Sequence, residues 1–446
     1  MLPADFHLTV TAHFEGRTLL GGAPFAIVDL SERAAARIRA WIEGDPVGED
    51  GALARALVLA NLAQPVPPPR ASPPVTVVIP VRDRSIARLL AALDAAEVIV
   101  VDDASAGDTV RREAQAAGAR YLGRAVRGGA GTARNDGLAA ATHELVACVD
   151  SDCVPRPGWL DALLPHFADP ELSAAAPRIV ALDDEREVPE TGLQEAARGA
   201  GAPRDRLRAA LARYERGHSP LDRGPDPARV VPYGRVPFVP GAALVVRRHL
   251  RFDPTLHGGE DVEFVWRVPY ARYVPDARVA HDHRTDPGAW FKRRVYYGRT
   301  AAGIARRHPG KARPLNVSPW TTAAWLALAA RRPVSATAIL GTATALAARE
   351  VGARTAIELA GLGSLRSGRV VADALTRTWW PLAAVAAARV PQARLPLAAA
   401  LATKTPLQIA DDLAYGIGLW QGCVQQRTLD PLLPARPWKF RHTALS

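Results

Sequence analysis

The sequence has few cysteines, few aromatic residues and no long apolar run. Its cysteines, Cys148, Cys153 and Cys423, are too few for a disulfide framework and form no C-x-x-C pair for zinc. The longest uncharged runs, 314–330 and 333–348, are shorter than the ~20 apolar residues of a bilayer span. The first residues lack a basic stretch followed by an apolar run, so we expect no signal peptide. We therefore expect a cytoplasmic protein.

The composition is that of a globular protein with an excess of positive charge. Hydrophobic residues make up 48% and charged residues 23% of the 446 residues, which favours two or three domains. The net charge of +11 divides into −2 for residues 1–70 and +13 for the rest. A basic body attracts nucleotide diphosphates, nucleic acid or anionic lipid. Without a recognition-helix motif or a run of stacking aromatics, we expect no nucleic-acid partner.

The chain divides into four segments. Residues 1–62 predict a small α+β domain, with Ser31 as the N-cap of a helix over 32–41. Six prolines mark residues 63–74 as a linker. In residues 75–310 apolar strands alternate with helices, and residues 311–446 are Ala-rich and helical. Within the third segment, 198–240 is rich in Gly, Pro and Arg and indicates a long loop.

Alternating strands and helices predict an α/β fold with a mostly parallel sheet and helices on both faces. In such sheets the ligand lies beyond the carboxyl ends of the strands. Polar clusters follow three expected strands directly: Arg82-Asp83 after 75–80, Asp102-Asp103 after 97–101, and Asp150-Ser151-Asp152 after 145–149. We expect these clusters to meet at one edge of the sheet.

The D-x-D pair Asp150 and Asp152 predicts a divalent-metal site, Mn²⁺ or Mg²⁺. Two carboxylates at a strand end can hold a hard cation beside a diphosphate and so stabilise a departing nucleotide. The alternative is a solvated turn, because D-x-D is a common sequence. His281 and His283 follow another apolar segment. A lone histidine is usually structural, but one of these two, with His281 preferred, is a candidate third ligand, since neutral imidazole suits Mn²⁺ better than Mg²⁺.

Glu260 and Asp261 follow two glycines and begin a helix over 261–267. One interpretation is acidic residues that complement the helix dipole. The other is a general base, a carboxylate that removes the proton of an acceptor hydroxyl as the new C–O bond forms. With the D-x-D pair upstream, the second interpretation is favoured, and Asp261 and Glu260 become the candidate catalytic residues.

Two further basic segments have open interpretations. The glycine-rich run 128–135 (GGAGTARN) places Arg134 at the third glycine position and precedes the fourth strand, which argues against a Rossmann dinucleotide site. Arg134 and Asn135 can instead hold a base or a phosphate. The segment 290–299 (WFKRRVYYGR) predicts a basic-aromatic helix that either exposes a solvated face or contacts diphosphate, an acidic acceptor or lipid headgroups.

Six blocks in this order resemble glycosyltransferase family 2. They are 77–84 (VVIPVRDR), 100–105 (VVDDAS), 133–138 (ARNDGL), 148–152 (CVDSD), 258–264 (GGEDVEF) and 279–281 (VAH). The resemblance implies a GT-A nucleotide-sugar fold and an inverting, metal-dependent transfer from a UDP-sugar. It assigns the metal to Asp150, Asp152 and His281, and the base to Asp261. The residues that it implies for the nucleotide sugar are Pro80, Val81, Arg82, Asp83, Asp102, Asp103, Arg134, Asn135, Asp150 and Ser151.

A closer resemblance is to the glycosyltransferases of the mycofactocin system. It rests on 219–230 (SPLDRGPDPARV), 233–244 (YGRVPFVPGAAL) and 297–302 (YGRTAA). It implies β-linked transfer of glucose from UDP-glucose to mycofactocin, a peptide-derived redox cofactor, or to its precursor. Residues 1–62 also resemble PqqD-type peptide-binding domains through 17–24 (RTLLGGAP); the alternative is a stabilising extension without a ligand.

A second class of enzyme stays open. The basic helix and the Ala-rich tail also suit a glycosyltransferase that acts on a polyprenyl phosphate or another lipid or polysaccharide acceptor. In that case the C-terminal region would contact the inner face of the cell membrane peripherally. The Q-x-x-R-W signature of large processive synthases is absent from the sequence, which argues against that group.

Overall fold

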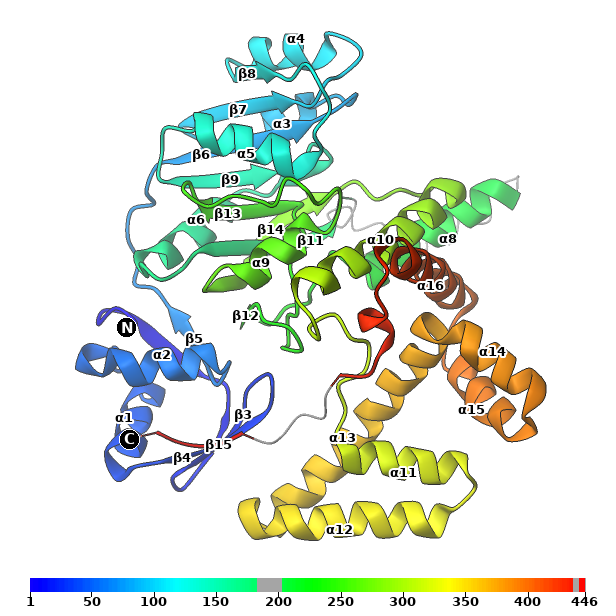
Figure 1. The fold of residues 1–446 in the computed structure, drawn as a ribbon. Coiled ribbons are helices and arrows are strands. Elements are labelled where there is room, and N and C mark those ends of the chain that lie inside the picture. Colours follow the sequence, from blue (N-terminus) through cyan, green and yellow to red (C-terminus); the bar gives the residue numbers. More distant parts are fainter. Residues whose placement is uncertain (183–202, 436–440, 446) are drawn as a thin grey trace. The chain divides into compact units, whose positions relative to one another are not determined.

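The computed structural model describes residues 1–182, 203–435 and 441–445. These residues form two compact units, one made of residues 1–285 with the C-terminal strand, the other of residues 286–439 (Figure 1). The first unit therefore ends before the helix at 287–307, whereas the sequence predicts a catalytic segment that extends to residue 310. The reason is packing: this helix lies along a late helix of the second unit, as described below.

The N-terminal part of the first unit is the small α+β domain that the sequence predicts. Its elements are β1 (His7–Val10), β2 (His13–Glu15), β3 (Thr18–Gly21), β4 (Ala26–Leu30), α1 (Glu32–Ile42) and α2 (Gly51–Leu59). Ser31 caps α1 as expected, since its hydroxyl accepts a hydrogen bond from the Ala34 amide at 3.1 Å. Ile38 and Trp41 of α1 pack with Leu57 of α2 in the core.

Two strands join this domain from outside the expected boundaries. The first residues of the proline-rich segment form β5 (Ala63–Val66), which pairs antiparallel with β1. The C-terminal strand β15 (Arg441–Leu445) pairs in parallel with β4, giving the order β15-β4-β3-β2. Neither pairing can be read from local sequence, because each depends on a partner strand far away along the chain. The PqqD-type resemblance of the domain stays a prediction.

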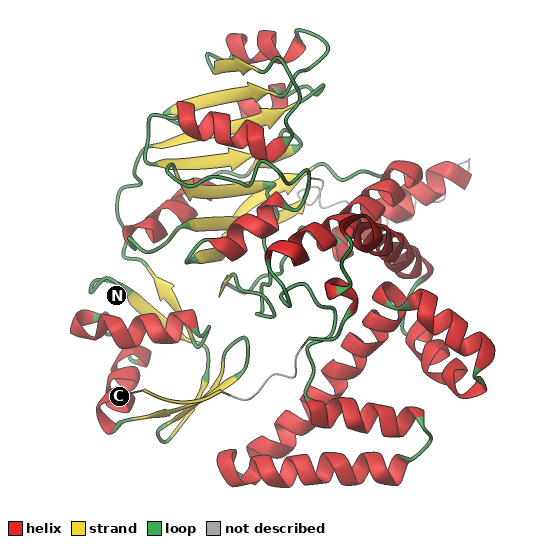
Figure 2. Ribbon diagram, viewed as in Figure 1, coloured by secondary structure: helices red, strands yellow, loops and turns green. Residues whose placement is uncertain are grey.

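The larger part of the first unit is a mixed, mostly parallel sheet, visible as the yellow strands in Figure 2. Its order is β10-β14-β11-β13-β9-β6-β7-β8, and β12 pairs with β14. Strands β8, β7, β6 and β9 are parallel, β13 is antiparallel to β9 and β11, and β14 is parallel to β11. The strands are β6 (Val75–Val81), β7 (Glu97–Asp102), β8 (Arg120–Gly123), β9 (Leu145–Val149), β10 (Cys153–Pro155), β11 (Ala174–Ala181), β12 (Ala228–Arg229), β13 (Ala243–Arg247) and β14 (Ala271–His281).

Helices cover both faces of this sheet. The helices are α3 (Ala87–Ala91), α4 (Thr109–Ala116), α5 (Ala130–Ala140), α6 (Trp159–Leu163), η2 (Leu164–Ala168), α8 (Pro203–His218) and α9 (Glu260–Arg267). Val77 of β6 belongs to the same core as Trp159 of α6, whereas the next residue, Val78, packs in a second core with Leu138 of α5 and Phe264 of α9. This alternation along one strand is what a sheet buried on both faces requires.

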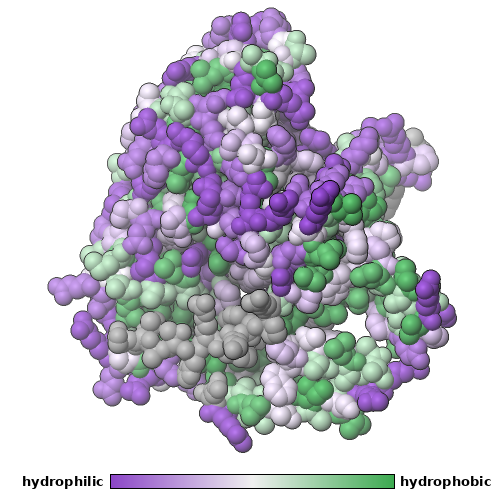
Figure 3. All heavy atoms as spheres, in the orientation of Figure 1, coloured by the Kyte–Doolittle hydropathy of each residue, from purple (hydrophilic) through white to green (hydrophobic). Residues whose placement is uncertain are grey.

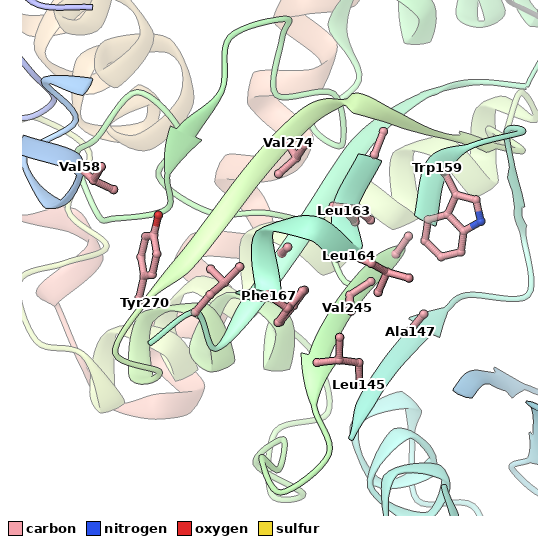
Figure 4. Close-up of a cluster of buried hydrophobic side chains, with 14 of the residues drawn as sticks. Val58, Leu145, Ala147, Trp159, Leu163, Leu164, Phe167, Val245, Tyr270 and Val274 are labelled. Carbon is pink, nitrogen blue, oxygen red and sulfur yellow. The ribbon is translucent and has the colours of Figure 1, made fainter. Parts of the chain in front are cut away.

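The first core extends beneath the sheet to the N-terminal domain. Figure 4 shows Trp159, Leu163 and Phe167 beside Val245 and Val274 of the strands, with Val58 of α2 at one end of the cluster. Around α4 and β8, by contrast, the surface seen in Figure 3 is largely hydrophilic. The hydrophobic interior therefore joins the small domain and the sheet in one folded unit.

The expectation of a long loop over 198–240 is wrong for residues 203–218, which form α8; residues 198–202 lie outside the described residues. The Arg, Ala and Leu residues of α8 favour a helix. The frequency of Gly and Pro in the whole segment masked this local pattern.

The second unit is helical. It contains α10 (Pro287–Arg307), α11 (Pro319–Ala329), α12 (Pro333–Val351), α13 (Ala353–Asp373), the π-helix η3 (Ala374–Thr378), α14 (Trp380–Arg389), α15 (Pro391–Ala402) and α16 (Pro406–Gln426). Glycines let α10 and α16 approach closely: a Cβ on Gly298 would lie 2.0 Å from the Tyr415 carbonyl oxygen. Among the described residues, no helix combines the length and the apolar character that crossing a membrane requires.

Candidate active site

The ends of β6 and β7 form a connected pair of polar turns. Asp83 has a left-handed backbone (φ +49°), its amide donates to the Ser105 hydroxyl at 2.9 Å, and its carboxylate accepts from the Ala106 amide at 2.8 Å. Arg82 lies 3.3 Å from the same carboxylate, and both side chains are about half exposed. The first two predicted clusters are therefore neighbours, as the parallel register of β6 and β7 requires. Pro80 and Val81 lie in β6 and are buried.

The carboxylates of Asp102 and Asp103 organise the protein's own backbone. Asp102 accepts from the Ser105 amide at 2.9 Å and from the Tyr121 hydroxyl at 2.8 Å. Asp103 accepts from the amides of Gly128 and Gly129 at 2.7 and 2.8 Å, and so fixes the glycine turn that begins α5. Both aspartates are buried, which makes these bonds strong determinants of the turn geometry. Their contact with a nucleotide stays a prediction.

Arg134 is the centre of the site. Its guanidinium donates to Glu260 at 2.8 Å, to Asp150 at 2.6 Å and to the Gly241 carbonyl at 3.0 Å, and it is 2% exposed. A single buried cation thus joins the end of β9 to the beginning of α9. The two acidic clusters, 110 residues apart in the sequence, are thus brought together, and the residue that joins them was predicted only to hold a base or phosphate.

Asp261 is held by backbone amides beside this network. It accepts from Gly241 at 2.7 Å and from Val262 at 2.8 Å. Burial, followed by the negative charge of Glu260, raises the pKa of Asp261 to about 6. Gly241 is required here, because a Cβ at this position would lie 2.8 Å from an Arg134 nitrogen. A carboxylate with a pKa close to neutrality suits proton transfer near pH 7.

The D-x-D pair lies at the other side of Arg134. Burial raises the pKa of Asp150 against the opposing effect of Arg134, and the charge of Asp152 raises it further. His281 Nε2 lies 3.5 Å from the Asp152 carboxylate, because β14 ends beside the turn that follows β9. Ser151 lies between the two aspartates and is partly buried.

This donor set fits a divalent cation, but it is not preassembled around one point. Two carboxylates that repel each other, with an imidazole beside one of them, are ligands that suit Mn²⁺. Within the described parts of the chain, however, no group of three His, Cys, Asp or Glu side chains is arranged to hold a metal. The bond from Arg134 to Asp150 accounts for this, since it directs one carboxylate to the guanidinium.

Two residues lie behind His281, and only the second of them, Glu215, gave no signal in the sequence. The Nδ1 atom of His281 lies 3.2 Å from Nδ1 of His283, and His283 lies 3.7 Å from the carboxylate of Glu215 on α8. Glu215 is buried. The H-x-H spacing was visible in the sequence, but Glu215 gave no signal, because the segment that contains it was interpreted as a loop.

Asn135 has a structural role in this arrangement. Its amide donates to the Phe252 carbonyl at 2.9 Å and accepts from the Phe252 amide at 2.8 Å. The Phe252 ring in turn lies 5.3 Å from the Arg134 guanidinium carbon. Asn135 therefore ties α5 to the segment that precedes α9, and its contact with a nucleotide sugar stays a prediction.

Comparison with known proteins identifies the family. Residues 76–220 match the sequence model of Glycosyl transferase family 2. Over 469 aligned positions, which cover 94% of each chain, the protein is 36% identical to the Pre-mycofactocin glycosyltransferase of Mycobacterium tuberculosis, in both strain CDC 1551 / Oshkosh and strain ATCC 25618 / H37Rv. The chain belongs to glycosyltransferase family 2. It is a glycosyltransferase with a GT-A-type fold, as the sequence predicts.

The glycosyltransferase also resembles solved structures at low identity. Mannosyltransferase PcManGT from Pyrobaculum calidifontis, in complex with GDP-Man and Mn²⁺, is 20% identical, with a TM-score of 0.43 over 80% of this chain and 89% of that chain. Glucosyl-3-phosphoglycerate synthase from Mycobacterium tuberculosis, in complex with Mn²⁺, UDP and glucosyl-3-phosphoglycerate, is 20% identical, with a TM-score of 0.32 over 52% of this chain and 79% of that chain.

Proposed function

We propose that this glycosyltransferase transfers glucose from UDP-glucose, in β linkage, to mycofactocin or its peptide-derived precursor. The choice of acceptor rests on the 36% identity, over nearly the whole length of both chains, to a protein named Pre-mycofactocin glycosyltransferase. Similarity at this coverage includes the N-terminal domain and the helical unit as well as the family 2 segment. The sugar, the linkage and the inverting mechanism rest on the family resemblance of the sequence blocks.

The donor is held at the ends of β6, β7 and β9. The turns at Arg82-Asp83 and Asp102-Asp103 receive the nucleotide, and Asp150, Asp152 and His281 hold a divalent metal. When bound, the metal neutralises the charge that develops on the leaving diphosphate. The 3.5 Å approach of His281 to Asp152, and the repulsion between Asp150 and Asp152, support this assignment.

Asp261 is the general base of a single displacement. It takes the proton of the acceptor hydroxyl as that oxygen bonds to the anomeric carbon, and the bond from that carbon to the diphosphate oxygen breaks. Attack from the face opposite the leaving group inverts the anomeric configuration. The backbone bonds from Gly241 and Val262 hold the carboxylate in place, and burial, followed by the charge of Glu260, raises its pKa to about 6.

Product analysis tests this proposal directly. The purified protein is offered UDP-glucose, UDP-galactose, UDP-N-acetylglucosamine and GDP-mannose, each with a mycofactocin-type acceptor and Mn²⁺, and the products are measured by mass spectrometry. We expect a mass increase of one or more hexose units with UDP-glucose, and about 1,000-fold slower formation of that product with Asp261→Asn. A product formed only from another donor overturns the sugar assignment, and transfer only to a different acceptor overturns the substrate assignment.

One observation favours the second candidate, a glycosyltransferase with a lipid-linked acceptor. Hydrophobic residues reach the surface of the helical unit (green in Figure 3). The most exposed large apolar side chains of this unit include Leu326, Val334, Ile357 and Leu395, each more than 60% exposed. Flotation with liposomes that contain anionic lipid, followed by an acceptor screen with polyprenyl phosphates, separates the candidates. Transfer to polyprenyl phosphate without transfer to the mycofactocin-type acceptor would favour the lipid-linked reaction.

A further inference from the structure

A group of four polar side chains, three of them buried and Arg229 partly buried, lies beneath the sheet, where α2 of the N-terminal domain packs against it. We call it the basal cluster: His166 of η2, Arg229 of β12, and Tyr270 and Arg272 at the start of β14. Arg229 and Arg272 are register partners across the antiparallel pair β12–β14, so their side chains leave the same face of the sheet. In Figure 4, Tyr270 has its hydroxyl end turned toward Val58 of α2.

The cluster contains several donors that no described residue satisfies. Within the described parts of the chain, Nε and Nη1 of Arg272, Nε of Arg229, the Tyr270 hydroxyl and Nδ1 of His166 have no hydrogen-bond partner. Arg272 and Tyr270 are each 3% exposed and His166 is 8% exposed, so water reaches them poorly. Buried polar groups almost always have partners, and a concentration of unpaired ones indicates an absent ligand.

The charge of the cluster is also uncompensated. Arginine stays protonated, and an unpaired buried charge costs several kcal/mol. Asp169, a nearby carboxylate, is already bound to Arg55 at 2.5 Å and to the Glu171 amide at 3.1 Å. Burial lowers the pKa of Arg229. The group that partly offsets this lowering is a tyrosine, Tyr270, rather than a carboxylate.

The pKa of His166 is also affected by the positive charge of the basal cluster. Burial, followed by the charge of Arg272, lowers the pKa of His166 to about 3, so the ring is neutral near pH 7. A neutral ring whose Nδ1 carries the proton can donate one hydrogen bond. The group therefore offers two guanidinium groups, one hydroxyl and one imidazole N–H, and no acceptor carboxylate. This combination matches the oxygens of an anion.

The basal cluster is separate from the donor site. Arg272 begins β14 and His281 ends it, and nine residues of extended strand span roughly 30 Å. Asp150, Asp152 and His281 lie at the far end of that strand. The diphosphate of a donor bound there cannot reach Arg272, so the cluster requires a ligand of its own.

We propose that the basal cluster is a binding site for a small oxyanion, a phosphate or carboxylate group, held between Arg272 and Arg229 and hydrogen-bonded by Tyr270 and His166. The anion compensates the buried charge and ties β12, β14 and η2 together where the N-terminal domain packs. Arg229 extends this connection to α2, since it donates to the Leu59 carbonyl at 2.8 Å. The site accordingly links anion binding to the stability of the junction between the two parts of this unit.

Thermal unfolding of the full chain tests this site. The melting temperature is measured at constant ionic strength in sodium chloride, in sodium phosphate and in sodium acetate, for the wild type, Arg272→Met and Arg278→Met. Arg278 is the matched control, because it lies on the same strand and is exposed. At an oxyanion concentration about 100-fold above Kd, we expect the wild type and Arg278→Met to melt about 5 °C higher than in chloride.

Arg272→Met should show no oxyanion-dependent increase, and in chloride it should melt at or above the wild type, because the uncompensated charge is gone. The difference between phosphate and acetate identifies which group is preferred. No increase in either oxyanion for the wild type, or an equal increase in Arg272→Met, overturns the proposal; the second result would place the anion at the donor site. If Arg272→Met does not fold, Tyr270→Phe is tested in its place. We expect this variant to bind the oxyanion with a Kd about fivefold weaker than that of the wild type. An unchanged Kd overturns the proposed site.

Discussion

If Asp261 is the general base, the rate of transfer by the glycosyltransferase should depend on pH. Burial and Glu260 raise the pKa of Asp261 to about 6, and only the ionised carboxylate accepts a proton. About nine-tenths of such a group is ionised at pH 7 and about one-tenth at pH 5. The rate of transfer should therefore fall about tenfold between these values. A carboxyl group at its ordinary pKa of 3.8 would remain almost fully ionised at pH 5, and the rate would hardly change.

Two variants separate the base from its surroundings. Asp261→Asn keeps the size of the side chain but cannot accept the proton, and we expect kcat to fall about 1,000-fold, or about 4 kcal/mol, with donor binding nearly unchanged. Glu260→Gln removes the charge that raises the pKa of Asp261, so the midpoint of the acid limb should move to lower pH. Asp276→Asn, an exposed aspartate of β14, should leave the profile unchanged.

The assay is initial-rate UDP release, corrected for hydrolysis without acceptor, at fixed ionic strength from pH 4.5 to 8. A profile that stays flat down to pH 5, with the wild type folded by circular dichroism, would refute the raised pKa. An Asp261→Asn variant that keeps more than a tenth of the wild-type kcat would refute the base assignment itself, whatever the profile.

Three further changes test other parts of the structure. Asp152→Ala should bind UDP with equal affinity in the presence and absence of Mn²⁺, measured by calorimetry; a Mn²⁺ effect as large as in the wild type would reject its role as a ligand. Glu215→Gln should weaken Mn²⁺-dependent UDP binding about tenfold, because Glu215 orients His281 through His283; unchanged affinity would leave it a purely structural residue. Gly298→Ala should lower the free energy of unfolding by about 1–3 kcal/mol in urea, since its Cβ would meet the Tyr415 carbonyl. Gly341→Ala, an exposed helical glycine with open space around it, should instead be neutral or stabilising, and equal effects of the two would contradict the close packing.

Much of the fold was predictable because its signals are local. Apolar runs ending in acidic residues predicted β6, β7 and β9 and the edge of the sheet at which those acidic residues lie. Ser31 predicted the start of α1. Where local composition was ambiguous, prediction failed: α8 was hidden in a segment rich in Gly and Pro, and with it Glu215.

Residue types and their order along the chain were enough to place the protein in its family and to predict two acidic clusters and a candidate base. The sequence could not show that a buried arginine, Arg134, joins those clusters, because hydrogen-bond geometry exists only once α5, β9 and α9 have packed. Nor could it show that Arg229 and Arg272 face each other without a counter-charge. Whether a charged side chain is buried affects its free energy far more than which type of residue carries the charge. Burial is decided by the tertiary structure.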